Sequence, residues 1–370
     1  MSSANDLLEL EELELEAEDP TPDEPIRQPF DPSKIRVETK QLSIDSLVAR
    51  IEHGEIILQP EFQRNEVWKD GARSRLIESI ILRIPLPAFY VDATDEDKWL
   101  VIDGQQRLST LRRFVLDQTL RLSGLEFLTS LEGATFDDLA RAYQRRIRET
   151  NVTVHLIEKG TPPEVKFNIF RRINTGGLPL SAQEIRHALN PGPAGELLKT
   201  LASSDEFLGA TRGGIPSSRM VDRECVLRFF AFYLLQPVAY EREEFDQFLS
   251  EWMSALNSLV SAEPASLEHP FRHAMVLSSR ILGPLAFRKR RGAPVNKALF
   301  EAWSVNLANL DDAQADALAG RSERLQQKFA QLMNDTAFDR AISQGTSHPS
   351  RVRLRFSEIQ RIIAETLNDQ

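Results

Sequence analysis

The chain has 370 residues, of which 41% are hydrophobic and 27% are charged, and these values are ordinary for a folded globular protein. No apolar run approaches the roughly 18 residues of a membrane-spanning helix, and the acidic N-terminus lacks the basic start of a secretory signal. Cys225 is the only cysteine, which excludes a disulfide within one chain, so we expect a cytoplasmic protein without membrane contact.

The net charge of −10 comes from one end of the chain. Residues 1–24 contain ten Asp or Glu and no Lys or Arg, and the rest of the chain has 45 acidic and 45 basic residues. Residues 1–33 also carry several prolines and too little apolar surface for a core, so we expect a disordered acidic tail. The alternative is an acidic strip that covers a basic groove until nucleic acid displaces it.

Residues 34–190 alternate strand and helix patterns. RVETKQL predicts a strand, and Ser43 can cap a helix over IDSLVARIEHG. The segment IILQPEFQRNEVW is irregular, and a periodic helix then runs from Asp70 to the prolines at 85 and 87. AFYVDA and KWLVID, separated by TDEDK, predict a β-hairpin.

The remaining elements of this region follow the hairpin. QQRLSTLRRFVLD predicts a helix, as do TFDDLARAYQRRIRET, with Thr135 as its cap, and PPEVKFNIFRRINTG. NVTVHLIE predicts a strand between the last two. Together these elements predict a mixed α/β domain over 34–190.

Residues 191–370 lose the strand signals, and helical periodicity dominates them. We expect an all-α domain here, with loops at 209–218, 262–272 and 288–295. The fold class is therefore α+β: a mixed α/β core followed by a helical domain, with the boundary near residue 190.

The segment WLVIDGQQRLSTLRRF carries the strongest functional pattern. A strand ends at Asp103, Gly104 allows a sharp turn, and a helix opens with Gln105, Gln106 and Arg107. Helix N-termini favour anions, the glutamines add donors, and an arginine can grip a phosphate with two hydrogen bonds. Asp103 can hold a metal ion or a water. A capped strand–helix junction with a surface arginine explains the pattern equally well.

Two further segments are rich in glutamine, arginine and asparagine. One lies in the irregular stretch before the helix at Asp70, and the other lies at the end of the helix that precedes Gly176-Gly177. The excess of such side chains suggests a phosphate or nucleic-acid surface. Their residues are Gln63, Arg64, Arg171, Arg172, Asn174 and Gly177.

The order QPEFQRNEVW, LVIDGQQRLSTL and FNIFRRINTGGLPLSAQEIRHAL resembles the GmrSD-type, or DGQQR, domain family over roughly residues 35–240. The resemblance implies a fold related to ParB and sulfiredoxin. It also implies a module that hydrolyses nucleotides within a bacterial antiphage or modification-dependent restriction system. MVDRECVLRFFAFYLL is similar to the family's helical continuation.

The resemblance assigns roles to residues of this chain. Its DGQQR motif falls on Asp103, Gly104, Gln105, Gln106 and Arg107, which become the catalytic and phosphate-binding residues, with Mg²⁺ or another divalent cation at Asp103. Nucleotide contacts are expected from the motifs at residues 63–64 and 171–177. The partners implied are a nucleoside triphosphate, DNA and a separate nuclease subunit, and the chain could form a homo-oligomer.

The chain departs from relatives that carry an HNH-type nuclease. Its six histidines do not form the Asp/Glu-His, Asn and His arrangement of a one-metal nuclease. His269 and His273 stand on either side of Pro270, and metal ligands four residues apart need a continuous helix. Nuclease activity would therefore come from the DGQQR domain itself or from a partner.

Three basic clusters are candidates for DNA contact: RRIRE at 145–149, RKRRG at 288–292 and RVRLRF at 351–356. Arg288, Lys289, Arg290 and Arg291 form the strongest candidate because they lie in an expected loop beside Gly and Pro. A solvated loop or helix face is an equally good interpretation of each cluster.

Three functions fit the sequence. The first is metal-assisted hydrolysis of a nucleoside triphosphate coupled to DNA sensing or cleavage. The second is a switch that binds nucleotide or DNA without turnover and recruits a nuclease. The third is a DNA nuclease that uses the DGQQR pocket.

Overall fold

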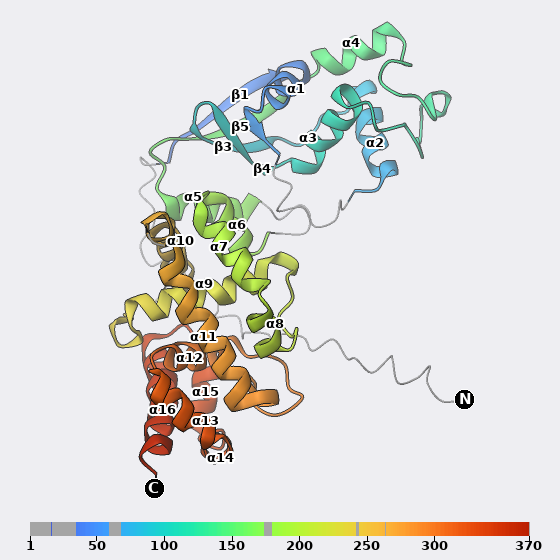
Figure 1. Cartoon of the computed structure of the whole chain (residues 1–370). Coiled ribbons are helices and arrows are strands. Elements are labelled where there is room, and N and C mark those ends of the chain that lie inside the picture. Colours follow the sequence, from blue (N-terminus) through green and yellow to red (C-terminus); the bar gives the residue numbers. More distant parts are fainter. Residues whose placement is uncertain are drawn as a thin grey trace, which may run out of the picture. The chain divides into compact units, whose positions relative to one another are not determined.

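The computed structural model describes Glu16 and residues 35–58, 68–173, 180–241, 244–262 and 264–369. The chain divides into two compact units between Leu180 and Ser181, and Glu16 belongs with the C-terminal one. The first unit is mixed α/β and the second is helical (Figure 1). The predicted fold class is thereby confirmed, and the division lies about ten residues before the predicted change of pattern.

The first unit is built on a mixed sheet of five strands in the order β1-β5-β3-β4-β2 (Figure 1). β3 and β4 pair in antiparallel fashion and confirm the predicted hairpin. β5 pairs parallel to β3 and antiparallel to β1, while β2 pairs parallel to β4. The strands are β1 Val37–Ser43, β2 Ile56–Ile57, β3 Phe89–Asp95, β4 Lys98–Asp103 and β5 Asn151–Glu158.

One face of this sheet is apolar and packs against helices. Phe89, Val91, Val154 and Leu156 alternate along β3 and β5 and are buried in a core shared with α1, α2 and α3. Ser43 caps α1 as predicted, accepting a 3.2 Å hydrogen bond from the amide of Ser46. The helices are α1 Ile44–Glu52, α2 Asp70–Ile81, α3 Gln105–Leu111, α4 Arg141–Glu149 and α5 Pro163–Ile173.

Two local predictions for this unit are wrong. Thr135 does not cap a helix, because its amide and hydroxyl both donate to Asp138 in a local turn, and α4 begins only at Arg141. The irregular segment after α1 contains a short strand, β2, which the two isoleucines form by pairing with β4.

The second unit is a helical bundle around a core rich in aromatic side chains. Phe229, Phe230 and Phe232 of α9 are almost fully buried, as is Trp303 of α12. α6 starts with a capping box formed by Ser181 and Glu184. Among the described residues, no helix has both the length and the apolar character needed to cross a membrane. The helices are α6 Ala182–Leu189, α7 Pro193–Ala202, α8 Asp205–Thr211, α9 Val221–Leu235, α10 Phe245–Ala262, α11 Pro264–Leu282, α12 Lys297–Ala308, α13 Asp312–Gly320, α14 Ser322–Leu332, α15 Thr336–Ser343 and α16 Pro349–Asn368.

The expected loop over 262–272 is largely helical instead. α11 runs through Pro270, and the rings of His269 and His273 lie 5.9 Å apart on it. A proline inside a helix removes a backbone hydrogen bond, but Phe271 directly after Pro270 and Ala274 one turn further along are both fully buried. Their packing outweighs the local cost, so Pro270 does not interrupt the helix as the sequence suggests.

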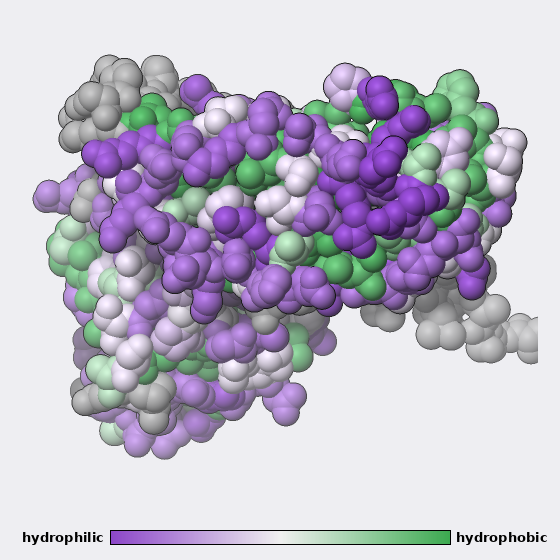
Figure 2. Space-filling model, turned by 90° about the horizontal axis from the view of Figure 1, so that it is seen from above, coloured by the Kyte–Doolittle hydropathy of each residue, from purple (hydrophilic) through white to green (hydrophobic). Residues whose placement is uncertain are grey.

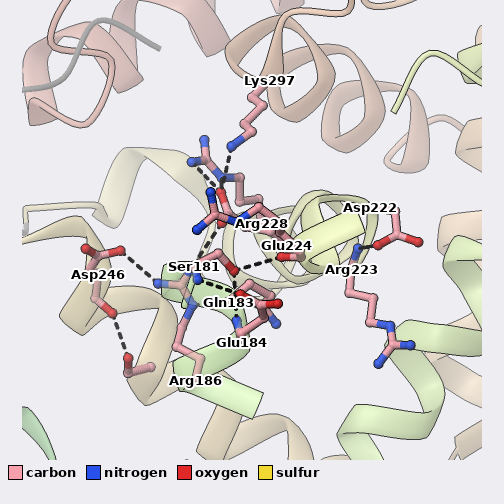
Figure 3. A network of polar contacts seen from close by, with 12 residues as sticks. Ser181, Gln183, Glu184, Arg186, Asp222, Arg223, Glu224, Arg228, Asp246 and Lys297 are labelled. Atoms are coloured by element: carbon pink, nitrogen blue, oxygen red, sulfur yellow. Dashed lines mark hydrogen bonds and ion pairs between the residues drawn. The ribbon is translucent and has the colours of Figure 1, made fainter. Parts of the chain in front are cut away.

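A buried network of charges ties α6 to the rest of this unit (Figure 3). Arg186 is 1% exposed and donates to Glu224 of α9 at 3.1 Å and to Asp246 of α10 at 2.8 Å. Arg228 donates to Glu224 and, at 2.9 Å, to the fully buried Glu301 of α12. Removing one member would leave a buried charge without its partner, so the network fixes how α6, α9, α10 and α12 pack against one another.

Candidate functional site

The predicted junction of strand, aspartate, glycine and helix is present at the end of β4. Gly104 has φ 100° and ψ 8°, and α3 begins directly after it without a side-chain cap. A Cβ atom at this position would lie 2.4 Å from Cδ1 of Phe89. The left-handed backbone and the close approach both require glycine, so the turn after Asp103 is tightly defined.

Arg107 points into the protein and does not offer its guanidinium to a ligand. It is 8% exposed, lies 4.4 Å from the centre of the Phe89 ring, and donates to the carbonyls of Pro87 and Ala88. Its Nη2 also donates to Oδ2 of Asp103 at 2.8 Å. The role expected for Arg107 in gripping phosphate is therefore corrected: this residue positions Asp103 and the strand junction.

Burial shifts the pKa of Arg107, but the side chain keeps its positive charge. Desolvation lowers the pKa of the guanidinium, while the charge and hydrogen bond of Asp103 oppose that shift. An arginine keeps its proton under such conditions. The pair is thus a fixed cation holding a carboxylate.

Asp103 remains accessible despite this pairing. Its side chain is 37% exposed, and only Oδ2 has a contact within the described residues. Gln105 and Gln106 are partly exposed in the first turn of α3. The junction therefore presents one carboxylate edge beside two neutral amides, a set that can hold a cation, a water or a phosphate oxygen.

A row of polar side chains crosses the sheet beside Asp103. Tyr90 of β3 pairs with Asp103 on one side and with His155 of β5 on the other, and the Tyr90 and His155 rings are 4.6 Å apart. The hydroxyl of Thr39 on β1 lies 2.9 Å from Nδ1 of His155. Sequence reasoning missed this row, although polar and apolar residues alternate in FYVDATD and NVTVHLIE and indicate one polar face.

A buried ion pair lies further along the same face. Lys166 of α5 bonds both carboxylate oxygens of Asp92, at 2.9 and 3.1 Å, and also contacts the hydroxyl of Thr94. Lys166 and Asp92 are 8% and 9% exposed. Their charges are mutually satisfied, so this pair fastens α5 to the sheet.

The other predicted nucleotide-binding residues are only partly described. Arg171 and Arg172 are exposed in the last turn of α5, which the Lys166 pair holds against the sheet. Gln63, Arg64, Asn174 and Gly177 lie outside the described residues. Within the described ranges, no three His, Cys, Asp or Glu side chains gather closely enough to hold a metal by themselves.

The basic loop at 288–292 differs from its prediction at one residue. Arg288 is 1% exposed and donates to the carbonyls of Ala286 and Thr211, so it cannot contact nucleic acid. That assignment is corrected. Lys289 is partly buried, whereas Arg290 and Arg291 are exposed and remain candidates.

The two other basic clusters are helical. Arg146 and Arg148 of α4 bind the Ile81 carbonyl and Asp45, and Arg145 is exposed. Strongly hydrophilic side chains gather over α4 in Figure 2. RVRLRF lies in α16, where Arg355 is buried against Glu301 and helical spacing scatters the arginines.

Residues 44–190 match the model of the family described as the GmrSD restriction endonuclease, N-terminal domain. The match includes the junction at Asp103 and the capping box of α6, and it confirms the resemblance seen in the sequence. Residues 44–190 are therefore similar to the N-terminal domain of that family, and this similarity is consistent with a part in a restriction or defence system. No curated protein and no solved structure matches the chain.

Proposed function

We propose that the domain over residues 44–190 binds and hydrolyses a nucleoside triphosphate, and that the chain couples this reaction to DNA sensing or cleavage in a bacterial defence system. The observation that carries the proposal is the glycine-specific junction at Asp103. It lies within a match to a restriction endonuclease family and holds a half-exposed carboxylate beside two glutamines.

In this proposal the residues of the junction have separate tasks. Asp103 orients the attacking water or a bound cation, and Arg107 keeps that carboxylate in place through its 2.8 Å hydrogen bond. Gln105 and Gln106 donate to phosphate oxygens. Positive charge for the phosphates comes from Arg171 and Arg172, and from Arg64, because Arg107 is committed to the protein.

A divalent cation such as Mg²⁺ fits the junction as a shared ligand. Magnesium is commonly held by one or two carboxylates together with substrate phosphates, so a single carboxylate such as Asp103 suffices on the protein side. When bound, the ion would neutralise charge on the phosphates. Within this chain, the residue that would hold it is Asp103.

A nucleotide-binding switch without turnover is the second candidate, and the orientation of Arg107 favours it. A phosphoryl-transfer site needs cationic donors at the phosphates, and the arginine of the motif is turned away from them. In that case the chain would recruit a separate nuclease when nucleotide or DNA is bound.

One experiment separates these functions and a third, direct cleavage of DNA. The purified chain is incubated with each nucleoside triphosphate and Mg²⁺, with and without supercoiled DNA, and released phosphate and nicked DNA are measured together. The proposal expects phosphate release that DNA alters. Binding without release indicates the switch, and nicking without nucleotide indicates a nuclease.

A further inference from the structure

The helical unit contains a cradle for a carboxylate beside its basic loop. Asn296, which is 4% exposed, caps α12 through its Oδ1 and donates from Nδ2 to the Ile342 carbonyl at 2.8 Å. Lys289 lies next to it and bonds the hydroxyl of Ser343 at 2.7 Å. The two donors of the cradle are the Asn296 amide and the Lys289 ammonium. Each is oriented by a hydrogen bond to α15, apart from any contact with a carboxylate in the cradle.

Glu16 occupies this cradle with three polar contacts. Its Oε1 lies 2.7 Å from Nζ of Lys289, and its Oε2 accepts from Nδ2 of Asn296 at 3.1 Å. Its backbone amide also donates to the Val295 carbonyl at 2.9 Å. A carboxylate held at both oxygens and through its main chain is a specific docking contact, since a solvated surface pair would lack the backbone bond.

Glu16 lies within the most acidic segment of the chain. Glu14 and Glu18 are two residues away from it in the sequence. Arg290 and Arg291 directly follow Lys289 and are exposed. The cation that Glu16 contacts is therefore followed directly in the chain by two exposed cations.

We propose that the acidic N-terminal segment of this chain docks through Glu16 into the cradle of Lys289 and Asn296 and competes there with DNA. Residues 1–24, which carry ten acidic side chains, belong to the same chain as the loop at 288–292. Their effective concentration at the loop is therefore high, even if each single contact is weak. DNA binding at Lys289, Arg290 and Arg291 then requires Glu16 to leave. The docking itself is independent of the proposed function, whereas the competition rests on its DNA-binding part.

Docking is tested in the full chain with a carbodiimide, which joins an amine and a carboxylate in contact by an amide bond and releases water to the reagent. Mass spectrometry of the digest should find Glu16 linked to Lys289. The pair of Lys328 with Glu365, 3.2 Å apart, serves as an internal control. Glu16→Gln and Lys289→Arg should each remove only the first link. A digest that contains the Lys328–Glu365 link but lacks the Lys289–Glu16 link would overturn the proposal.

Competition is tested by the affinity of the full chain for a short duplex DNA at low salt. Glu16→Gln should tighten binding about threefold or more, whereas Glu12→Gln, with the same change of charge, should have a smaller effect. Adding Arg290→Gln and Arg291→Gln should abolish the gain. Equal effects of the two glutamate variants, or none, would overturn competition. Absence of DNA binding in every variant would overturn competition and DNA binding together, while the cross-link would still decide docking.

Discussion

At the scale of single residues, the junction after β4 works as a clamp on one carboxylate. Arg107 joins the strand end to the chain at Pro87 and Ala88 and leaves one edge of Asp103 exposed. The guanidinium also lies over the Phe89 ring, and a lysine could not reproduce this set of contacts. Gly104 lies close to the same ring. The orientation of the Asp103 carboxylate, which Arg107 holds, therefore depends on how Gly104 and Arg107 pack against Phe89.

Gly104→Ala should destabilise the protein more than an ordinary glycine replacement. The new methyl group combines a left-handed backbone with a 2.4 Å approach to Phe89, and overpacking of this kind costs about 1–3 kcal/mol. Gly133→Ala is the matched control, because Gly133 has φ 79° and open space around it. In urea denaturation, the free energy of unfolding of Gly104→Ala should be at least about 1 kcal/mol lower than that of the control. Equal midpoints would show that the Phe89 side chain moves aside without cost.

The sequence identified the junction because strand, aspartate and glycine are local signals. It could not reveal that Arg107 turns inward, since the direction of a long side chain depends on carbonyls at residues 87 and 88. The same limit applies to Arg288, which looks like a loop cation but is buried by contacts with Thr211.

At the scale of elements, α6, α9, α10 and α12 are joined by one network of buried charges (Figure 3). Burial raises the pKa of Glu224, but Lys297, Arg228 and Arg186 outweigh it and hold that pKa well below its ordinary value of 4.5. Because the folded pKa is depressed, this stabilisation is complete above about pH 4.5 and is lost as the pH falls below that value.

Glu224→Gln should cost about 3–5 kcal/mol at neutral pH, because it leaves buried cations uncompensated. It should also flatten the acid branch of the stability profile below pH 4.5. Asp316→Asn, which breaks the exposed pair with Arg280, should cost less than about 1 kcal/mol. Thermal melting of the three proteins between pH 3 and 7 measures both effects. An unchanged acid branch in Glu224→Gln would contradict the account.

Elements with strong local signals were predicted well, and those set by tertiary packing were not. The β3–β4 hairpin and the Ser43 cap follow from alternation and capping chemistry. The strand β2 has only two residues and forms because it pairs with β4. The helix α11 continues through Pro270 because the residues that follow, Phe271 and Ala274, are buried. Neither feature has a signature in its own residues.

At the scale of the whole molecule, charge is divided between an acidic end and exposed basic surfaces. The formal net charge of −10 hides this division, because the chain beyond residue 24 is neutral. The proposed DNA binding of such a neutral body is expected to be weak and strongly salt-dependent, with phosphate contacts as its main source. The exposed part of the loop at 288–292 would contribute to such contacts.

Replacing Arg290 and Arg291 by glutamine should reduce the slope of log affinity against log salt by up to about 0.9 per lost phosphate contact. The loss should be similar for DNA of different sequences, because phosphates carry no base identity. Arg280→Gln, another exposed arginine of the helical unit, is the control. A slope that stays unchanged in the double variant would show that the loop is only solvated.

The central claim, that Asp103 is the reactive carboxylate of a nucleotide-hydrolysing site, is tested most directly by the rate of phosphate release in Asp103→Asn. Asp95→Asn is the matched control, because Asp95 lies at the other end of the same β3–β4 hairpin. The account predicts that Asp103→Asn lowers the rate by about 100-fold or more with an unchanged circular dichroism spectrum, while Asp95→Asn keeps the full rate. Full turnover in a folded Asp103→Asn protein would contradict the account.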